Sequence, residues 1–355
     1  MRAPPPRPNL GAERPHVHFA WAPARARAAG GFTLVELMVA LVLAMLVIGI
    51  AVAVYAGTSR NRGDLERSSR LAENAHYASE LLNDEIRLAG YFAEVNVVGA
   101  TWQAPDPCAT DLAQLGWSGD SFMVPVFTIP VPIVGYRRGD AEPACLPNRK
   151  AGTAIVVLRR VGVEAATVAS IATHPHLQVP KCTADSLVKR WVLSVKPADF
   201  TMQNIDCKTI ADARPLVVRS YYVADCNECG ADTTPTLKRA ELIDGKIVVT
   251  PLAEGVESLQ IEYGFDANGD GNPDRFLEYP DPLLGPAYGE WFNVMAVRFY
   301  VLFRSPDAQP FYKDASKSFN LGPAGYSAAA HDGYRRVLVT SIARLNNPAG
   351  RRETP

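Results

Sequence analysis

A long apolar segment near the N-terminus limits what this chain can fold into. Between Leu37 and Thr58 the only ionisable side chain is Tyr55, whose phenol is neutral at pH 7. Roughly 20 residues of α-helix, at ~1.5 Å each, cross the hydrocarbon of a bilayer. The segment therefore predicts one membrane-spanning helix. Glu36 precedes it directly, and because a lone carboxylate in hydrocarbon is costly, we expect it to have a partner on another chain.

The residues before this segment resemble a leader rather than a folded element. Residues 1–29 are rich in Pro, Ala and Arg and have neither a helical nor a strand period. An ordinary secretory signal places small residues after its apolar core, whereas Gly30 and Gly31 stand before it. The arginines in the leader favour a cytoplasmic N-terminus, although Arg60 and Arg62 beyond the apolar segment weaken that inference.

The helical pattern continues past the apolar segment. Small and apolar residues recur at a spacing of three to four, as an amphipathic helix requires, at Leu65, Leu71, Ala75, Ala78, Leu82, Ile86 and Ala89. We expect this stripe to pack on a sheet, the neighbouring Asp84 and Glu85 to be solvated, and Gly90 to end the helix.

After Gly90 the pattern changes to short β-rich runs between Pro and Gly clusters. The predicted strands are 153–160, 190–195, 216–223, 256–265, 294–304 and 334–345. In 256–265 apolar and polar residues alternate, which predicts an antiparallel sheet with one face covered. A long N-terminal helix packed on such a sheet is an α+β fold. We expect residues 100–150 to form an irregular lobe and residues 346–355 a flexible tail.

Charge and cysteine content restrict the class of protein further. The 36 basic and 37 acidic residues give a net charge of -1, which argues against a nucleic-acid-binding surface. All cysteines follow the apolar segment, which suggests disulfides in an oxidising compartment: Cys108, Cys145, Cys182, Cys207, Cys226 and Cys229. Sequence cannot choose among the fifteen possible pairings, and we hypothesise neighbour pairing (108–145, 182–207, 226–229). A zinc site at Cys226 and Cys229 is the alternative, but no second CxxC supplies the other ligands.

Residues 266–274 have the spacing of a calcium-binding loop. Oxygen-bearing side chains occupy positions 1, 3, 5 and 9 of this loop, and Gly271 stands at position 6. A backbone carbonyl is available at position 7. The candidate ligands are therefore Asp266, Asn268, Asp270, Asn272 and Asp274. An EF-hand would carry Glu at position 12, where Leu277 stands. We therefore predict one Ca²⁺ in an EF-like loop on a β scaffold. The alternative, a hairpin turn rich in Asx and Gly without metal, stays open.

The stretch Gly31-Phe32-Thr33-Leu34-Val35-Glu36 resembles the type III signal of type IV pilins and pseudopilins. The resemblance implies that a prepilin peptidase cuts between Gly31 and Phe32 and methylates Phe32. It also implies that Glu36 meets the N-terminal amine of a neighbouring subunit. The expected divisions are a leader (1–31), a transmembrane assembly helix (32–58), an amphipathic helix (59–90), a periplasmic head (91–345) and the tail.

Three further stretches resemble the PilW-type minor pilins of type IV pili: ENAHYASELLNDEIRLAGYF, VESLQIEYGFDANGDGNPDRF and YRRVLVTSIARLN. This implies an inner-membrane protein that joins other minor and major pilins and the assembly machinery, supporting pilus biogenesis, twitching motility or adhesion. A minor pseudopilin of a type II secretion system is the first rival. A membrane-anchored periplasmic enzyme or receptor stabilised by Ca²⁺ is the second. No G-x-S-x-G, P-loop or G-x-G-x-x-G motif is present, and we predict no catalytic residues.

Overall fold

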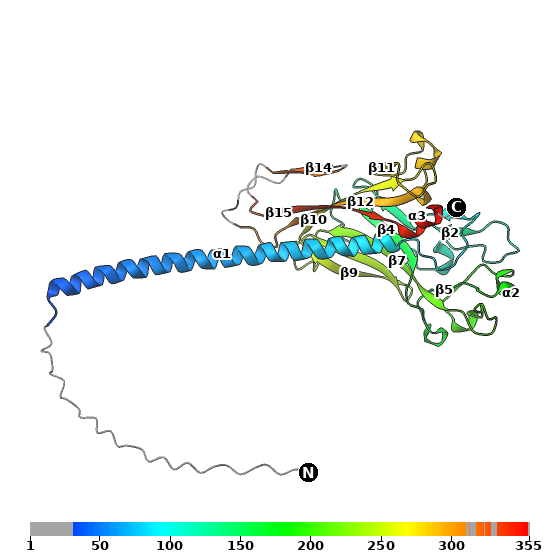
Figure 1. Ribbon diagram of the computed structural model, residues 1–355, viewed down its shortest axis with the longest axis horizontal. Helices are drawn as coiled ribbons and strands as arrows, with labels where there is room; N and C mark the ends of the chain where they lie inside the picture. Colours follow the sequence, from blue (N-terminus) through cyan, green and yellow to red (C-terminus); the bar gives the residue numbers. More distant parts are fainter. Residues whose placement is uncertain (1–30, 310–311, 313–316, 323, 328–331, 354–355) are drawn as a thin grey trace, which may run out of the picture. The chain divides into compact units, whose positions relative to one another are not determined.

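The computed structural model describes residues 31–309, 312, 317–322, 324–327 and 332–353 (Figure 1). The leader, residues 1–30, lies outside the described residues. The chain divides after Asn61 into two compact units, which are considered separately. Helix α1, Leu34–Leu88, contributes to both.

In the first unit, α1 carries the apolar segment. Leu34–Leu88 is the one helix, among the residues that the structure describes, that is long and apolar enough to cross a membrane. From Leu34 to Ser59 the side chains are exposed, except for the half-buried Ala56. Such an all-round apolar surface needs lipid or other helices to cover it.

The second unit contains two main antiparallel sheets. The larger consists of β3 Ile133–Tyr136, β4 Ile155–Val161, β5 His176–Gln178, β6 Val192–Ser194, β7 Ala213–Ala224, β8 Thr236–Ile243 and β9 Lys246–Glu254. The smaller has the order β11-β10-β12-β15, formed by Arg275–Leu277, Val256–Phe265, Val294–Arg304 and Arg336–Arg344. Two short pairs remain, β1 Thr101–Gln103 with β2 Thr128–Pro130, and β13 Ser318–Leu321 with β14 Ala324–Ser327. The described part of this unit also contains two shorter α-helices, α2 Thr183–Ser186 and α3 Asn346–Glu353.

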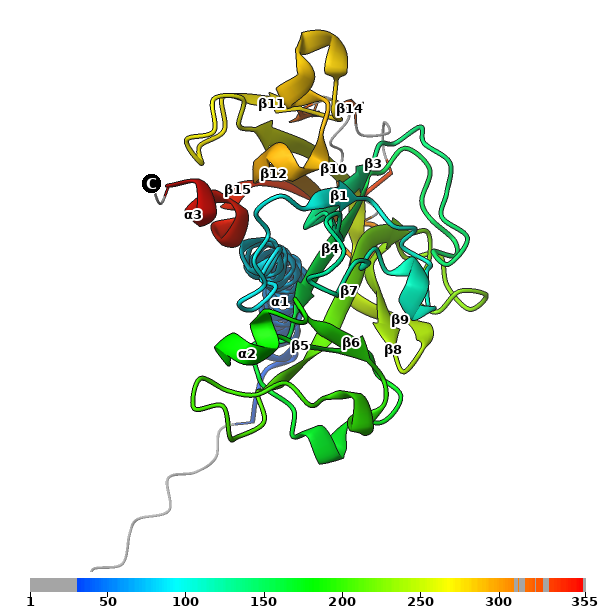
Figure 2. The same ribbon diagram turned by 90° about the vertical axis from the view of Figure 1, so that its right-hand side faces the viewer.

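Residues 62–88 of α1 pack against both main sheets. Figure 2 looks along this helix, with β12 and β15 on one side and β4 and β7 on the other. The predicted stripe is buried from Leu71 to Ala89 and joins one core with side chains of both sheets, such as Val156 and Phe299. Leu65 is the exception, because its side chain is 70% exposed. The stripe is therefore covered only from Leu71 onward.

The predicted antiparallel head is confirmed, but two expectations about the solvent exposure of polar and charged side chains are wrong. In β10, Glu257 and Gln260 are buried rather than solvent-facing. Glu257 is paired with Arg336, and the Gln260 side chain donates to the carbonyl oxygen of Gly152, so both faces of this strand are covered. Glu85, which we expected to be solvated, is also largely buried. Two arginines of the larger sheet, Arg160 and Arg219, balance its charge through ion pairs.

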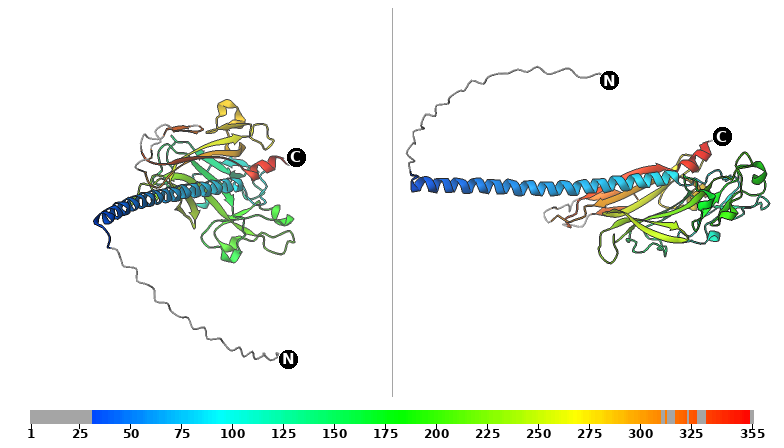
Figure 3. Two further views of the ribbon diagram at one scale, coloured as in Figure 1. Left: turned by 60° about the vertical axis from the view of Figure 1, so that its left-hand side comes forward. Right: turned by 90° about the horizontal axis from the view of Figure 1, so that it is seen from below.

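The C-terminal segment is helical rather than a flexible tail over residues 346–353. Pro348 and Ala349 of α3 are buried, and the helix lies beside the end of α1 (Figure 3). The side chain of Asn347 donates to the carbonyl oxygens of Leu88 and Ala89. The last carbonyls of a helix have no partner within it, so α3 supplies donors that α1 needs.

Three disulfides connect parts of the head. They pair Cys108 with Cys145, Cys182 with Cys207, and Cys226 with Cys229, which is the neighbour pairing expected from the sequence. The zinc alternative for Cys226 and Cys229 is wrong here, because a disulfide has no thiolate to offer a metal. The 100–150 region contributes β1, β2 and β3, and through Trp117 it joins a second core that includes Trp191.

Candidate assembly motif and candidate metal loop

The processing motif lies at the start of α1. Gly31, Phe32 and Thr33 precede the first helical residue and are exposed, with Phe32 86% exposed. The backbone N–H and the hydroxyl of Thr33 each donate to Glu36 Oε2 at 3.2 Å, and the Glu36 N–H donates to Thr33 Oγ1 at 3.2 Å. This reciprocal pattern is a capping box. The sequence pattern T-x-x-E, at Thr33 and Glu36, is the signal by which sequence alone could identify it.

The capping box leaves part of the Glu36 carboxylate available. Both side-chain bonds that Glu36 accepts in the described part of the chain involve Oε2. A carboxylate has about four lone-pair sites, so Oε1 has capacity for an added cation. The structure therefore places an acceptor at the head of the exposed apolar helix, next to the predicted cleavage position.

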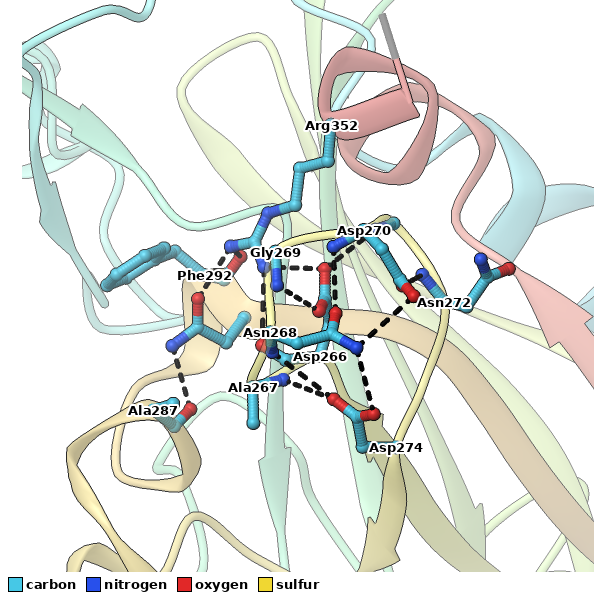
Figure 4. A network of polar contacts seen from close by, with 12 residues as sticks. Asp266, Ala267, Asn268, Gly269, Asp270, Asn272, Asp274, Ala287, Phe292 and Arg352 are labelled. Carbon is cyan, nitrogen blue, oxygen red and sulfur yellow. Dashed lines mark hydrogen bonds and ion pairs between the residues drawn. The ribbon is translucent and has the colours of Figure 1, made fainter. Parts of the chain in front are cut away.

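The second candidate site, the Asx loop (residues 266–274), connects β10 to β11. The two strands pair directly before and after it, with Phe265 opposite Arg275. Asp266 Oδ1 accepts from the N–H of Gly269 at 2.7 Å, and its Oδ2 accepts from the N–H of Gly271 at 2.9 Å. Asp274 Oδ2 accepts from the N–H of Ala267 at 2.7 Å. These bonds hold the loop as a tight hairpin connection (Figure 4).

Glycine at position 271 is required by both conformation and packing. Its backbone φ is 83°, an angle that residues other than Gly rarely adopt. A Cβ there would lie 2.7 Å from the carbonyl oxygen of Ala349 in α3. The loop and the C-terminal helix therefore touch closely.

Arg352 of α3 supplies positive charge to the loop. Its Nη1 lies 2.9 Å from Asp266 Oδ2, and its Nη2 donates to Asn293 Oδ1 at 2.5 Å. The Asp266 side chain is fully buried. Burial alone raises the pKa of Asp266, but the hydrogen bonds from Arg352 and from the N–H groups of Gly271 and Gly269 outweigh it and lower the pKa. Sequence reasoning missed Arg352, because it assigned the segment to a flexible tail.

The five predicted calcium ligands are close in sequence, but their carboxylates face different partners. Asp266 faces Arg352, while Asp274 faces the backbone and side chain of Asn268 (Figure 4). Within the residues that the structure describes, no group of three or more His, Cys, Asp or Glu side chains is arranged to hold a metal ion. The geometry agrees with a hydrogen-bonded hairpin whose charge is balanced by arginine, and calcium binding stays a prediction.

Comparison with protein families gave two matches to separate parts of the chain. Residues 26–52 match the prokaryotic N-terminal methylation motif, and residues 220–347 match the family described as type IV pilus-assembly protein W (PilW). Together they support a PilW-type minor pilin of type IV pili. Comparison with curated proteins gave no match, and comparison with solved structures gave none.

The two matches fall on the two candidate sites. The methylation motif includes Gly31, Phe32 and Glu36, and the PilW region includes the Asx loop and all of the smaller sheet. A PilW-type pilin takes part in pilus assembly as a structural component. The two matches imply other pilus components and a prepilin-processing system as partners, and the motif with its apolar helix fits an inner-membrane anchor.

Proposed function

We propose that this PilW-type minor pilin enters or primes the type IV pilus through the Glu36 carboxylate, which pairs with the N-terminal ammonium of a neighbouring pilin. The observation that carries the proposal is the position of Glu36, at the head of an apolar helix whose side chains are exposed. A charge pair within apolar surroundings is tolerable only when both partners are present, and breaking it is costly. The pair therefore sets the register between helices.

Processing at Gly31–Phe32 is the step that creates the new amine. The two residues lie before α1 in non-helical, exposed chain, and this makes the peptide bond accessible to a membrane peptidase. Removal of residues 1–31 would leave Phe32 as the methylated N-terminus and Glu36 as the fifth mature residue. The head then occupies the periplasm, where its three disulfides can form. Twitching motility and adhesion are the processes that such a pilus would support.

The proposal includes one Ca²⁺ in the Asx loop, held by oxygens from Asp266, Asn268, Asp270, Asn272 and Asp274. The spacing of these residues supports it. Arg352 now neutralises Asp266, and two cations cannot share one buried carboxylate without repulsion. Calcium therefore has to displace Arg352 or bind through the remaining oxygens.

Glu36→Val and Thr33→Ala together test the assembly role. Both remove the capping box, but only Glu36→Val removes the carboxylate. In Glu36→Val we expect normal cleavage, seen by mass spectrometry as methylated Phe32. Its recovery in sheared pili should fall about tenfold or more, because losing one member of a buried ion pair costs ~3–5 kcal/mol. Thr33→Ala should be recovered almost as well as the wild type.

Three outcomes would contradict the proposal. Wild-type recovery of Glu36→Val would show that the carboxylate has no role in assembly. An uncut Gly31–Phe32 bond in cells with active prepilin peptidase would favour a membrane-anchored enzyme or receptor. Complementation of a type II secretion mutant rather than a pilus mutant would identify a minor pseudopilin instead.

A further inference from the structure

The disulfide between Cys226 and Cys229 differs from the other two in its ring size and surroundings. Its cysteines are 3 residues apart in the β7–β8 loop, compared with 25 and 37 for the other pairs. Cys226 is buried and Cys229 is exposed. Lys238 of β8 is itself largely buried, at 6% exposure, and its Nζ lies 3.3 Å from Cys229 Sγ. Of the two cysteines, the exposed one therefore has an ammonium group beside its sulfur.

The β7–β8 loop keeps its shape through bonds that do not involve sulfur. The Asp232 carboxylate accepts from the backbone N–H groups of Asn227, Glu228 and Thr234, at 2.9, 2.6 and 2.8 Å. The Asn227 side chain also donates to Glu254 Oε1 at 2.6 Å. None of these contacts uses a cysteine side chain, so we expect them to persist when the disulfide opens.

Ring size indicates that opening this disulfide costs the fold little. In the chain-entropy model, a disulfide shifts the unfolding equilibrium by a factor that scales with loop length to the power of about 1.5. With sequence separations of 3, 25 and 37, the bond at Cys226 restrains the unfolded chain about 20- to 40-fold less than the other two. The head should therefore stay folded with Cys226 and Cys229 reduced.

We propose that Cys226–Cys229 is a dithiol–disulfide exchange site of the head, whose partner is the dithiol of a protein oxidoreductase. Cys229 is the sulfur that is attacked, and Lys238 is the residue that stabilises its thiolate. Thiol–disulfide exchange depends on the access of the attacked sulfur and on the stability of the thiolate that leaves. Cationic neighbours lower the pKa of a thiol and so stabilise its thiolate.

The exchange balances in two steps. A thiolate of the partner attacks Cys229 Sγ, the bond between Cys226 and Cys229 breaks, and Cys226 leaves as a thiolate. The partner's second thiolate then attacks the partner sulfur of the mixed disulfide, and Cys229 leaves as a thiolate beside Lys238. Two electrons have passed from the partner's dithiol to the Cys226–Cys229 pair, and the partner departs as a disulfide.

The surroundings of Lys238 determine how strongly it acts. Burial lowers the pKa of Lys238, and the nearby carboxylate of Asp232 opposes this effect. The pair Cys182–Cys207 is an internal comparison, because Cys207 is also exposed. The contact that the structure shows for Cys207 Sγ is the carbonyl oxygen of Ile205 at 4.0 Å, which cannot stabilise a thiolate.

The test uses the full chain purified in detergent. The protein is equilibrated with a reduced thioredoxin-type dithiol protein or with graded glutathione buffers, then acid-quenched, labelled with a maleimide and mapped by peptide mass spectrometry. We expect Cys226 and Cys229 to become labelled while the other four cysteines stay oxidised and the far-UV circular dichroism spectrum is unchanged. The dithiol protein should act faster than glutathione at equal thiol concentration.

Variants of Lys238 separate charge from structure. Lys238→Met should make the equilibrium constant for reduction of Cys226–Cys229 in glutathione buffers about tenfold less favourable, equivalent to a change of about one unit in the pKa of the Cys229 thiol, and Lys238→Arg should restore most of it. Lys246→Met, in the neighbouring strand, is the matched control. Simultaneous reduction of all three disulfides, or equal equilibrium constants for reduction of Cys226–Cys229 in Lys238→Met and wild type, would overturn the proposal. Reaction with glutathione but not with the dithiol protein would overturn the choice of partner. These measurements are independent of pilus assembly.

Discussion

Replacing Arg352 by methionine removes the positive charge that balances a buried carboxylate. The guanidinium lies 2.9 Å from Asp266 Oδ2, the Asp266 side chain is 0% exposed, and that of Arg352 is 21% exposed. Removing one partner of a buried pair typically costs ~3–5 kcal/mol. Two backbone N–H groups still bind Asp266 and water reaches Arg352, so we expect a loss of about 2–3 kcal/mol, below that range.

Urea unfolding monitored by tryptophan fluorescence measures this loss, and a double-mutant cycle isolates the pair. Arg352→Met, Asp266→Asn and the double variant should show non-additivity of about 1–3 kcal/mol, as residues in contact do. If the single changes add, or if Arg352→Met costs less than about 0.5 kcal/mol, the ion pair does not hold α3 on the Asx loop.

The difference in unfolding free energy between wild type and Arg352→Met should depend on pH, because the pKa of Asp266 is lowered in the folded protein. A carboxyl whose pKa is lower in the folded state stabilises the fold above its unfolded pKa, near ~3.9, and loses that effect as the pH falls through the folded pKa. The stability gap between wild type and Arg352→Met should therefore be constant from about pH 6 to 8 and shrink below about pH 4. A gap that grows on acidification would contradict this assignment.

Two further predictions concern the loop and the helix. Millimolar Ca²⁺ should raise the unfolding temperature of the full chain, and Asp270→Ala should abolish the rise; no rise in the wild type would refute calcium binding. Glu85→Gln should destabilise the head by about 2–4 kcal/mol in urea unfolding, because Glu85 Oε1 lies 2.6 Å from Arg219 Nη1 and 3.4 Å from Arg160 Nη2. The neighbouring Asp84→Asn, with a side chain 72% exposed, should cost less than about 0.5 kcal/mol, and equal effects of the two would count against the buried network.

Periodicity in the sequence predicted the parts of the fold that depend on local pattern. The predicted strands at 256–265 and 294–304 coincide with β10 and β12, and the helical stripe from Leu71 to Ala89 is buried. The β8–β9 hairpin was missed, although Asp244-Gly245, both with positive φ, is a strong hairpin signal.

Long-range charge pairing could not be predicted from local pattern. Glu85 and Arg219 are separated by 134 residues, and Asp266 and Arg352 by 86. From the sequence, such a charged side chain is predicted to face solvent, because the partner that allows its burial is brought near only by the fold. For the same reason, the spacing of the Asx loop identified a tight connection between strands but not the arginine that neutralises it.

Helix α3 makes two distant segments thermodynamically dependent on each other. It donates to the carbonyl end of α1 through Asn347 and to the loop after β10 through Arg352. Local opening exposes amides in contiguous cooperative units. When the contact between α3 and α1 is weakened, the amides of Gly269 and Gly271 should therefore exchange faster with solvent deuterium. This should hold although about 180 residues of chain lie between the end of α1 and that loop.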